Sequence, residues 1–351
     1  MNIKELLKIA VDKNASDLHL VAGMPPILRI DGVLVFIEKT KAITGKEMEQ
    51  MVFLILTGEQ KARFVSSRDL DFGFQLENEN ARFRVNLHYE KNNIGLAARV
   101  ISGEMPTMEE LEMPPVIYKL LNLSQGFILV TGPTGCGKST TLASMVNYIN
   151  RNFRVNIITL EDPIEYLFKP EKSVIIQREL GSDMLSFADG LKHALRQDPD
   201  VIMVGEMRDL ETIATAITLA ETGHLVFATL HTYSAAQTVD RIIDIFPPHQ
   251  QNQIRMQLSL TLAGVISQRL LPKIAGGRTA AREIMINTPA VSNIIRENKI
   301  AQLKTAIETG ARDGMVSMDQ DLKRLYKGKI IAKEAAQSQM TNPELLEKIF
   351  S

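Results

Sequence analysis

The sequence is short of cysteine, because Cys136 is the only one among its 351 residues. A single cysteine excludes a disulfide within the chain, and it excludes the zinc sites that are built from paired cysteines. The 6 histidines never occur at the His-x-x-x-His spacing that brings two imidazoles to one face of a helix. We therefore expect no metal ion that is held by protein ligands alone.

The chain has neither an excess of positive charge nor a long apolar run. Its 40 Lys and Arg residues balance 41 Asp and Glu residues, so the net charge is −1 and nucleic acid is not expected as a partner. No run of about 18 uncharged apolar residues is present to span a membrane. The first residues, "MNIKELLKIAVDKN", form an amphipathic pattern without the apolar run of a signal peptide. We expect a cytoplasmic protein without a transmembrane segment.

The chain is longer than one hydrophobic core usually supports, so two domains are expected. Residues 1–101 are predicted to form a small α+β domain. Asp31-Gly32 between the apolar runs "ILRI" and "VLVFI" predicts a hairpin turn, and Thr44 with Glu47 predicts a capping box at the start of a helix. The stretches "DLHLV", "RFRVNLHY" and "IGLAARVI" are predicted strands.

The composition then changes twice. Residues 102–124 carry a glycine and three prolines among acidic residues, which is typical of an interdomain linker that contains a short helix. Residues 125–351 begin with alternating strands and helices, which predicts a parallel sheet covered by helices. The buried strands are expected at "GFILV", "VNIITL", "VIMV" and "LVFATL". Helix caps are expected at Asp209, Ser234, Thr288 and Ser317, and the last third is predicted to be mostly helical.

The segment "GPTGCGKSTT" lies between a predicted strand and a predicted helix, which is the context of a phosphate-binding P-loop. Its glycines allow backbone N–H groups to converge on a β-phosphate, Lys138 can bridge the β- and γ-phosphates, and Ser139 can ligate Mg²⁺. This context favours phosphate binding over a glycine-rich turn that binds nothing. The predicted nucleotide-binding residues are Gly132, Pro133, Thr134, Gly135, Cys136, Gly137, Lys138, Ser139 and Thr140.

Two acidic residues follow predicted parallel strands, where ligands of such sheets bind. Glu161 follows "IITL", and Glu206 follows "VIMVG". Asp200 precedes its strand, and four residues at about 3.3 Å each leave it roughly 13 Å from the phosphates. We favour Glu161 as the base that orients water and Glu206 as the acid linked to Mg²⁺, but the pattern leaves open which of the two is the general base.

Two histidines flank "LVFATL". His224 precedes this strand and His231 follows it, so they are not a ligand pair. His231 lies at the carboxyl end and can donate a hydrogen bond to a γ-phosphate. For His224, a packing or interface role is expected.

Together these residues resemble a known family. "GPTGCGKSTTLA", "ITLEDPIEY", "LRQDPDVIMVGEMRDLETI" and "TGHLVFATLHTYSAAQTVDRIIDIFP" resemble the Walker A, Asp, Walker B and His boxes of the type II/type IV secretion ATPase superfamily. "ASDLHLVAGMPPILRIDG" and "GGRTAAREIMINTPAVSNIIREN" resemble the PilT-type pilus retraction ATPases in particular.

The resemblance implies an α/β chain in which a smaller PAS-like α+β domain precedes a RecA-like P-loop NTPase domain with a helical C-terminal extension. It implies a homohexamer that hydrolyses ATP with Mg²⁺ at subunit junctions. Such a motor acts on the pilus base through an inner-membrane platform protein and drives twitching motility, which implies a peripheral location at the membrane. Arg84 and Arg99 match two family arginines that act on the nucleotide's phosphates, and Arg208 is a further candidate interface contact.

Retraction is favoured over pilus assembly or type II secretion because the chain has no tetracysteine zinc motif and no extra N-terminal domain. The segment "AVSNIIRE" resembles the retraction family's "AIRNLIRE", but Ser292 replaces an arginine, so an accessory retraction paralogue is an alternative. A kinase that uses the same P-loop needs an acceptor pocket with a lid, for which the sequence offers no candidate. A nucleotide-gated scaffold without turnover is disfavoured by the two acids and the arginine pair.

Cys136 lies where relatives usually carry a small residue, so it is expected to fill space. The adjoining helix N-terminus is nevertheless expected to favour its thiolate, which predicts sensitivity to thiol reagents.

Overall fold

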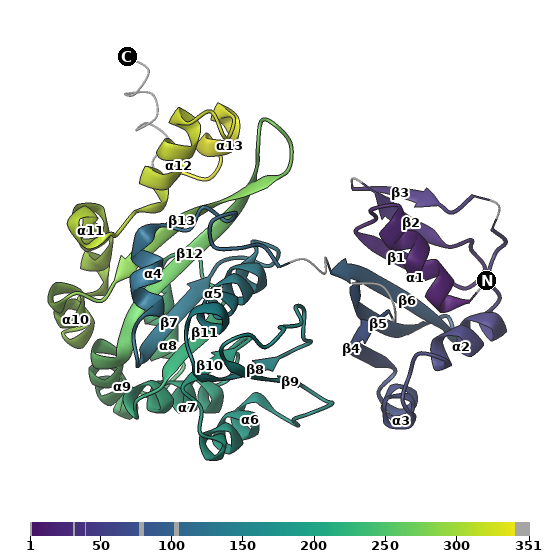
Figure 1. Ribbon diagram of the computed structural model, residues 1–351, viewed down its shortest axis with the longest axis horizontal. Coiled ribbons are helices and arrows are strands. Elements are labelled where there is room, and N and C mark those ends of the chain that lie inside the picture. Colours follow the sequence, from purple (N-terminus) through teal and green to yellow (C-terminus); the bar gives the residue numbers. More distant parts are fainter. Residues whose placement is uncertain (1, 31, 39, 77–80, 102–104, 341–351) are drawn as a thin grey trace. The chain divides into compact units, whose positions relative to one another are not determined.

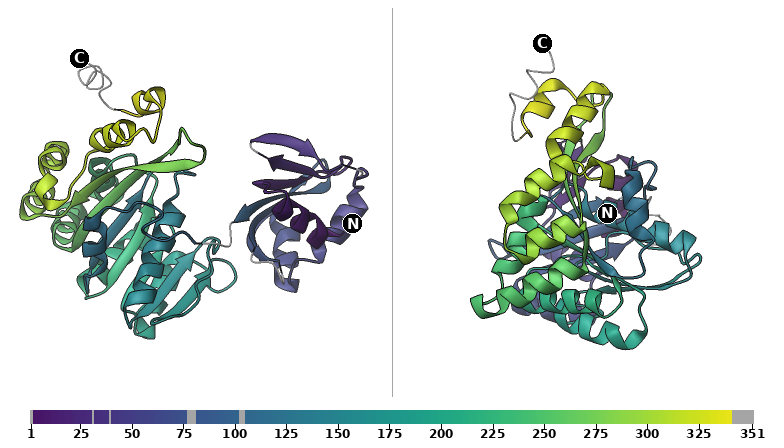
Figure 2. Two further views of the ribbon diagram at one scale, coloured as in Figure 1. Left: turned by 45° about the horizontal axis from the view of Figure 1, so that its top comes forward. Right: turned by 90° about the vertical axis from the view of Figure 1, so that its left-hand side faces the viewer.

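The structure is a computed structural model that describes residues 2–30, 32–38, 40–76, 81–101 and 105–340. The chain divides into two compact units (Figures 1 and 2). The first unit comprises Met1–Met105 and Asp162–Leu167, and the second comprises Pro106–Glu161 and Phe168–Ser351.

The first unit is built on a six-stranded antiparallel sheet in the order β3-β2-β1-β6-β5-β4. The predicted β2–β3 hairpin is present, although Asp31 of its turn lies outside the described residues. Of the six strands, only β4 was not predicted. The strands are β1 (Asp17–Leu20), β2 (Ile27–Ile30), β3 (Val33–Phe36), β4 (Asp69–Gln75), β5 (Arg82–Glu90) and β6 (Asn93–Ile101).

Three helices accompany this sheet: α1 (Ile3–Asp12), α2 (Gly45–Phe53) and α3 (Gly58–Ser67). The predicted capping box at α2 is confirmed, because the Thr44 side chain accepts from the Glu47 backbone and the Glu47 side chain accepts in return. Leu7 of α1, Met48 of α2 and Phe64 of α3 are fully buried in one core with the sheet. The unit therefore has a core of its own.

The second unit is built on a seven-stranded sheet in the order β13-β12-β7-β11-β10-β8-β9 (Figure 1). All neighbouring strands pair in parallel except β12 and β13, which are antiparallel. The strands are β7 (Gly126–Thr131), β8 (Asn156–Glu161), β9 (Val174–Glu179), β10 (Val201–Val204), β11 (Leu225–Leu230), β12 (Leu262–Pro272) and β13 (Arg278–Ile286).

Alternate residues of these strands enter two cores, one on each face of the sheet. Phe127 and Leu129 pack with residues of α6 to α11, whereas Ile128 and Val130 pack with residues of α4 and α5. The predicted α/β fold class, with a parallel sheet covered by helices, is confirmed, and β13 adds one antiparallel strand at the edge. The helices are α4 (Pro115–Leu121), α5 (Lys138–Asn152), α6 (Phe187–Ala194), α7 (Leu210–Glu221), α8 (Ala235–Asp244), α9 (Pro248–Thr261), α10 (Pro289–Arg296), α11 (Leu303–Thr309), α12 (Met318–Lys327) and α13 (Lys333–Gln337).

The segment 102–124 contains the short helix expected there, α4, while residues 102–104 lie outside the described residues. Met108, Ile117 and Leu121 are buried in the core on the α5 face of the second unit. The Arg282 guanidinium also donates to the Leu111 carbonyl at 2.8 Å. From Pro106 onward, this segment therefore belongs to the second unit.

The prediction that the last third is mostly helical is wrong for residues 262–286. This stretch forms the long antiparallel pair β12 and β13, and β12 extends the parallel sheet beside β7. A short apolar run such as "LAGVIS" cannot be assigned to helix or strand by periodicity when both of its faces are buried. Further along the chain, the predicted caps at Thr288 and Ser317 are confirmed at α10 and α12.

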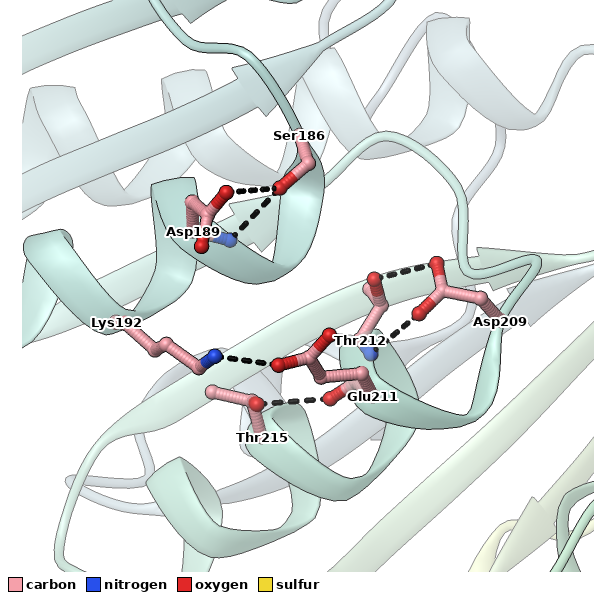
Figure 3. A network of polar contacts seen from close by, with 7 residues as sticks. All are labelled: Ser186, Asp189, Lys192, Asp209, Glu211, Thr212 and Thr215. Atoms are coloured by element: carbon pink, nitrogen blue, oxygen red, sulfur yellow. Dashed lines mark hydrogen bonds and ion pairs between the residues drawn. The ribbon is translucent and has the colours of Figure 1, made fainter.

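The start of α7 is fixed by polar contacts (Figure 3). The Asp209 carboxylate accepts from the Thr212 backbone N–H at 2.8 Å and from the Thr212 hydroxyl at 2.7 Å, which confirms the predicted cap. Lys192 of α6 forms an ion pair with Glu211, so α6 and α7 are also joined at this end. These contacts hold the chain directly after the loop that carries Glu206.

Candidate nucleotide-binding site

The parallel strands of the second unit bring the P-loop and three predicted side chains, His231, Glu206 and Glu161, to one edge of its sheet. The P-loop follows β7, His231 follows the neighbouring strand β11, and Glu206 lies two residues after β10. Glu161 ends β8, the next strand along. Because Thr131 pairs with Leu230 and Val204 pairs with Leu160, these strand ends lie side by side.

The P-loop backbone relies on glycine. Gly132, Gly135 and Gly137 have φ values of +144°, +78° and +87°, a region that side-chain-bearing residues rarely adopt. Gly137 caps the 15-residue helix α5, whose first N–H groups carry the partial positive charge that binds phosphate. Thr134, Gly135 and Ser139 are exposed on this surface. The loop can therefore present backbone N–H groups and a hydroxyl to an anion.

The Lys138 ammonium is folded against the loop that precedes it. It donates to the Gly132 carbonyl at 2.8 Å and to the Pro133 carbonyl at 3.1 Å, and it lies 3.5 Å from His231 Nδ1. The side chain is buried with 9% relative exposure, so its charge is directed into the loop. Such an ammonium is placed to bind phosphate oxygens that enter the loop.

Gln268 braces this loop from β12, and the sequence pattern had given no sign of it. Its amide donates to the Cys136 carbonyl at 2.7 Å, and its Oε1 accepts from the Thr141 hydroxyl at 3.0 Å. One buried side chain thus joins the loop to the first turns of α5. The residue lies in the stretch that was predicted to be helical, where nothing indicated that it would reach the P-loop.

Cys136 fills space beneath the loop, as expected, but its thiolate is not favoured. A Cβ atom at Gly132 would lie 2.6 Å from the Cys136 sulfur and 2.4 Å from the Gln268 carbonyl, so the thiol packs against a position that only glycine can occupy. Burial raises the pKa of the Cys136 thiol, and the Lys138 charge offsets this only in part. The helix N-terminus is therefore outweighed by burial, and the predicted thiolate character is corrected.

A cavity of about 350 Å³ opens beside the P-loop. It is lined by the loop itself, by Tyr233, by Arg269 and Leu270 of β12, and by Gln339. The Arg269 guanidinium donates to the Gln339 backbone carbonyl. The loop thus borders both an exposed polar surface and a concave space.

His231 links the P-loop to Glu206. Its Nδ1 faces Lys138, and its Nε2 lies 3.7 Å from Glu206 Oε2. Burial lowers the pKa of His231 below its ordinary value, Lys138 lowers it further, and the Glu206 carboxylate opposes both. The neutral imidazole is therefore favoured at pH 7, and it can donate one hydrogen bond and accept another.

The loop that carries Glu206 is held on both sides. The Gly205 N–H donates to the Leu160 carbonyl at 2.7 Å, and the Met207 N–H donates to the Thr229 carbonyl at 3.2 Å. Arg208 pairs with Glu206 at 2.8 Å, and the Glu206 side chain keeps 16% exposure. A fixed carboxylate is therefore reachable from solvent beside His231.

Glu161 has different surroundings. Its Oε1 accepts from the Thr159 hydroxyl at 2.7 Å and from the Gln177 amide at 3.1 Å, and the residue is buried with 7% exposure. Strand β8 is three positions from β7, which is about 14 Å at the usual strand spacing. Lys138, His231 and Glu206 form a chain of contacts next to the P-loop, and Glu161 lies farther along the same edge.

Two other residues lie at the opposite end of these strands. Asp200 accepts from the Asn156 backbone N–H at 2.8 Å, where β8 begins. His224 contacts the Leu219 carbonyl at 2.9 Å and the Thr222 hydroxyl at 3.3 Å, at the end of α7. Both positions agree with their exclusion from the phosphate site.

Arg84 and Arg99 lie in the first unit, on neighbouring strands of its sheet. The β5–β6 register makes them direct partners, so their side chains share one face. Arg99 forms an ion pair with Asp17 at 3.0 Å, and its side chain is 68% exposed. The structure therefore brings the two predicted arginines together on an open surface.

The chain matches known proteins along nearly its whole length. Residues 1–343 match the family described as "Type II/IV secretion system protein". The chain belongs to that family. It is 46% identical to the type IV pilus retraction ATPase PilT of Pseudomonas aeruginosa, over 98% of this chain and 99% of that protein. It is 45% identical to a twitching motility protein of Neisseria gonorrhoeae, over 98% of this chain and 91% of that protein.

The chain is also similar to a solved structure. The crystal structure of the pilus retraction motor PilT with bound ADP matches with a TM-score of 0.92 and 45% identity, and the match covers 99% of each chain. Within the described residues, no helix is both long and apolar enough to cross a membrane. Among the same described residues, no three His, Cys, Asp or Glu side chains are grouped so that they could hold a metal ion.

Ser292 has a structural role in α10. The Ser292 hydroxyl donates to the Ser259 carbonyl at 2.7 Å, and the Asn287 amide donates to the same carbonyl at 3.0 Å. This carbonyl lies in the last turn of α9. Ser292 therefore joins α10 to α9 by a hydrogen bond.

The contacts of His231 predict opposite shifts in two variants. In Lys138→Met, the loss of the neighbouring cation should raise the His231 pKa, and in Glu206→Gln, the loss of the anion should lower it further. NMR titration of the imidazole measures both midpoints. Lys192→Met removes an equal charge from the exposed face of α6 and should leave the midpoint unchanged. Equal midpoints in all four proteins would contradict this geometry.

The packing of Cys136 predicts slow alkylation. Because the thiol is buried and its pKa is raised, iodoacetamide should modify the folded chain at least about 10-fold more slowly than the urea-unfolded chain at the same pH. With a single cysteine, mass spectrometry reports this site alone. Cys136→Ser should preserve ATP turnover. Fast alkylation of the folded chain would restore the prediction of a reactive thiolate.

Proposed function

We propose that this chain is the subunit of a homohexameric motor that hydrolyses ATP to ADP and phosphate and powers retraction of a type IV pilus. The observation that carries the proposal is the contact chain from Lys138 through His231 to Glu206, which joins a P-loop to a fixed carboxylate. A P-loop alone supports nucleotide binding. A carboxylate and an imidazole beside it supply what hydrolysis needs in addition.

The residues fit a magnesium nucleotide. Ser139 is exposed in the first turn of α5, and the Glu206 carboxylate is reachable from solvent. The Ser139 hydroxyl and this carboxylate can therefore complete a metal shell made of phosphate oxygens and water. When bound, Mg²⁺ would neutralise charge on the β- and γ-phosphates. Lys138 would exchange its two loop carbonyls for phosphate oxygens. We propose that the remaining nucleotide contacts come from Gly132 to Gly137 and from Thr140.

The catalytic roles are divided among three side chains at the sheet edge. Glu206 lies nearest to the P-loop of the two acids, so it holds the metal's water shell or orients the attacking water. His231 donates from its neutral imidazole to the γ-phosphate and responds when that phosphate leaves. Glu161, held by Thr159 and Gln177, is the second acid of this edge. Which acid is the general base is decided by comparing the two glutamine variants.

Arg84 and Arg99 are proposed to act on a nucleotide that the P-loop of another subunit holds. Their exposed pair of guanidinium groups suits the charge that spreads over transferring phosphoryl oxygens. We propose that residues 1–101 form a PAS-like domain and residues 125–351 the ATPase domain, and that 102–124 links them, with the part from Pro106 packed on the second unit. Arg208 is proposed as a further contact between subunits.

The relatives of this chain favour pilus retraction as the movement that the motor drives. Proteins named for pilus retraction and twitching motility match this chain from end to end, so retraction is favoured over pilus assembly or type II secretion. An inner-membrane platform protein and the pilus base are the proposed partners. The motor would be cytoplasmic and bound peripherally at the membrane.

The Glu206→Gln variant tests the proposal. It keeps the shape of the side chain but removes the charge, so it should bind ATP normally and lose turnover by about 100-fold or more. ATP binding and phosphate release measure the two effects. Glu308→Gln, which removes an exposed carboxylate from α11, is the matched control and should keep turnover.

The same variant tests the biological role. In a host from which the gene has been deleted, Glu206→Gln should fail to restore twitching and should leave excess surface pili. Normal turnover in Glu206→Gln would remove this residue from the mechanism. Loss of all pili on deletion would instead support an assembly motor.

A further inference from the structure

Four charged side chains form a row across the sheet of the first unit. The strand register pairs Arg29 with Asp17, Asp17 with Arg99, and Arg99 with Arg84, from β2 through β1 and β6 to β5. Partners in register point to the same face of a sheet. We call these four residues the charged row. Its order places one carboxylate between two arginines, with the fourth residue at the β5 end.

Asp17 is the fixed member of the charged row. Its side chain is 12% exposed, and it accepts from the Ser16 hydroxyl at 2.8 Å and from Arg99 Nε at 3.0 Å. Arg29 Nε lies farther away, at 3.9 Å. The carboxylate therefore has a defined position, and its shortest contact with a charged group is the one to Arg99.

The contact to Arg99 uses only one corner of the guanidinium. Nε is bound to Asp17, whereas the two terminal nitrogens have no hydrogen-bond or ion-pair partner among the residues that the structure describes. Because the guanidinium is planar, a fixed Nε also restricts the directions in which the terminal N–H groups point. Asp17 thus orients Arg99 without occupying its outer donors.

The neighbouring Arg84 has no such partner within the described part of the chain. It is exposed, and its other cross-strand partner, Gly73 of β4, contributes no side chain. Two like charges directly opposite each other on a sheet are unfavourable. The sheet therefore keeps two adjacent cations although only one of them is neutralised locally, and this arrangement fits an anionic ligand.

From this geometry we propose that Asp17 is a positioning residue for ATP hydrolysis. By holding Arg99 Nε, it directs the terminal nitrogens of Arg99 beside Arg84, so that both present donors to the phosphoryl oxygens of a nucleotide. The proposal rests on the phosphate-binding role proposed above for the two arginines. It assigns to Asp17 no contact with the nucleotide itself.

A simple stabilising ion pair makes a different prediction. If the Asp17–Arg99 pair only stabilised the fold, Asp17→Asn would lower the melting temperature and leave the kcat for ATP unchanged. A positioning role predicts that Asp17→Asn lowers the kcat for ATP by about 10- to 100-fold, while the KM for ATP changes by less than about twofold. The melting temperature of the variant shows whether the fold is kept.

A double-mutant cycle on kcat distinguishes a positioning role of Asp17 from a purely stabilising one. Asp17→Asn should have no further effect in an Arg99→Ala background, because the group that it positions is absent. It should still lower kcat in an Arg84→Ala background. Asp71→Asn is the matched control, because Asp71 is an exposed strand acid of the same sheet that contacts Asn86, and it should leave kcat unchanged.

Each outcome decides one claim. Additive losses from Asp17→Asn and Arg99→Ala would overturn the role of Asp17, whereas normal turnover of Arg99→Ala would overturn the role proposed for Arg99. If Asp17→Asn does not fold, Asp17→Glu keeps the charge and displaces it by one methylene. That variant should show a smaller loss of kcat, and wild-type turnover in it would also overturn the proposal.

Discussion

The parallel register of β7, β11, β10 and β8 is the constraint on which the nucleotide site depends. It sets His231 next to the P-loop and Glu206 next to His231, because each side chain follows its strand by a fixed number of residues. A slip of one residue would turn every strand side chain to the opposite face. Alternate residues of β7 are buried in two separate cores, so such a slip is costly on both faces. The helices therefore secure the chemistry by holding the register.

Charged side chains in both units are held in place by neighbouring groups. Lys138 donates to the Gly132 and Pro133 carbonyls, which position its ammonium at the P-loop. Arg99 is neutralised by Asp17 at one nitrogen only, and Arg84 stands beside it. Glu206 is shared between Arg208 and His231. In a phosphate site, cations held in this way bind phosphate oxygens, and a held carboxylate can serve the metal ion or the attacking water.

Much of the fold and of the candidate site could be predicted from the sequence, because the signals for these features are local. Some predictions depend on residues only a few positions apart. These are the P-loop with Lys138, the acids that follow strands, and the helix caps at Thr44 and Asp209, and each lies at its predicted place in the fold. Contacts between distant segments had no local signal. Gln268 meets Cys136 across 132 positions, and Asp17 meets Arg99 across 82. The raised pKa of the Cys136 thiol could not be predicted from the sequence either. It depends on burial, whereas the helix N-terminus alone favours the thiolate.

We propose that a P-loop and an arginine pair from different subunits complete one site. Purified mixed oligomers that contain Lys138→Ala chains and Arg84→Ala/Arg99→Ala chains test it most directly, with each chain carrying its own affinity tag. Each variant alone should be inactive. In the mixed oligomer, some junctions combine an intact P-loop with intact arginines, so ATP turnover should reappear. No recovery in mixed oligomers of confirmed composition would contradict the account.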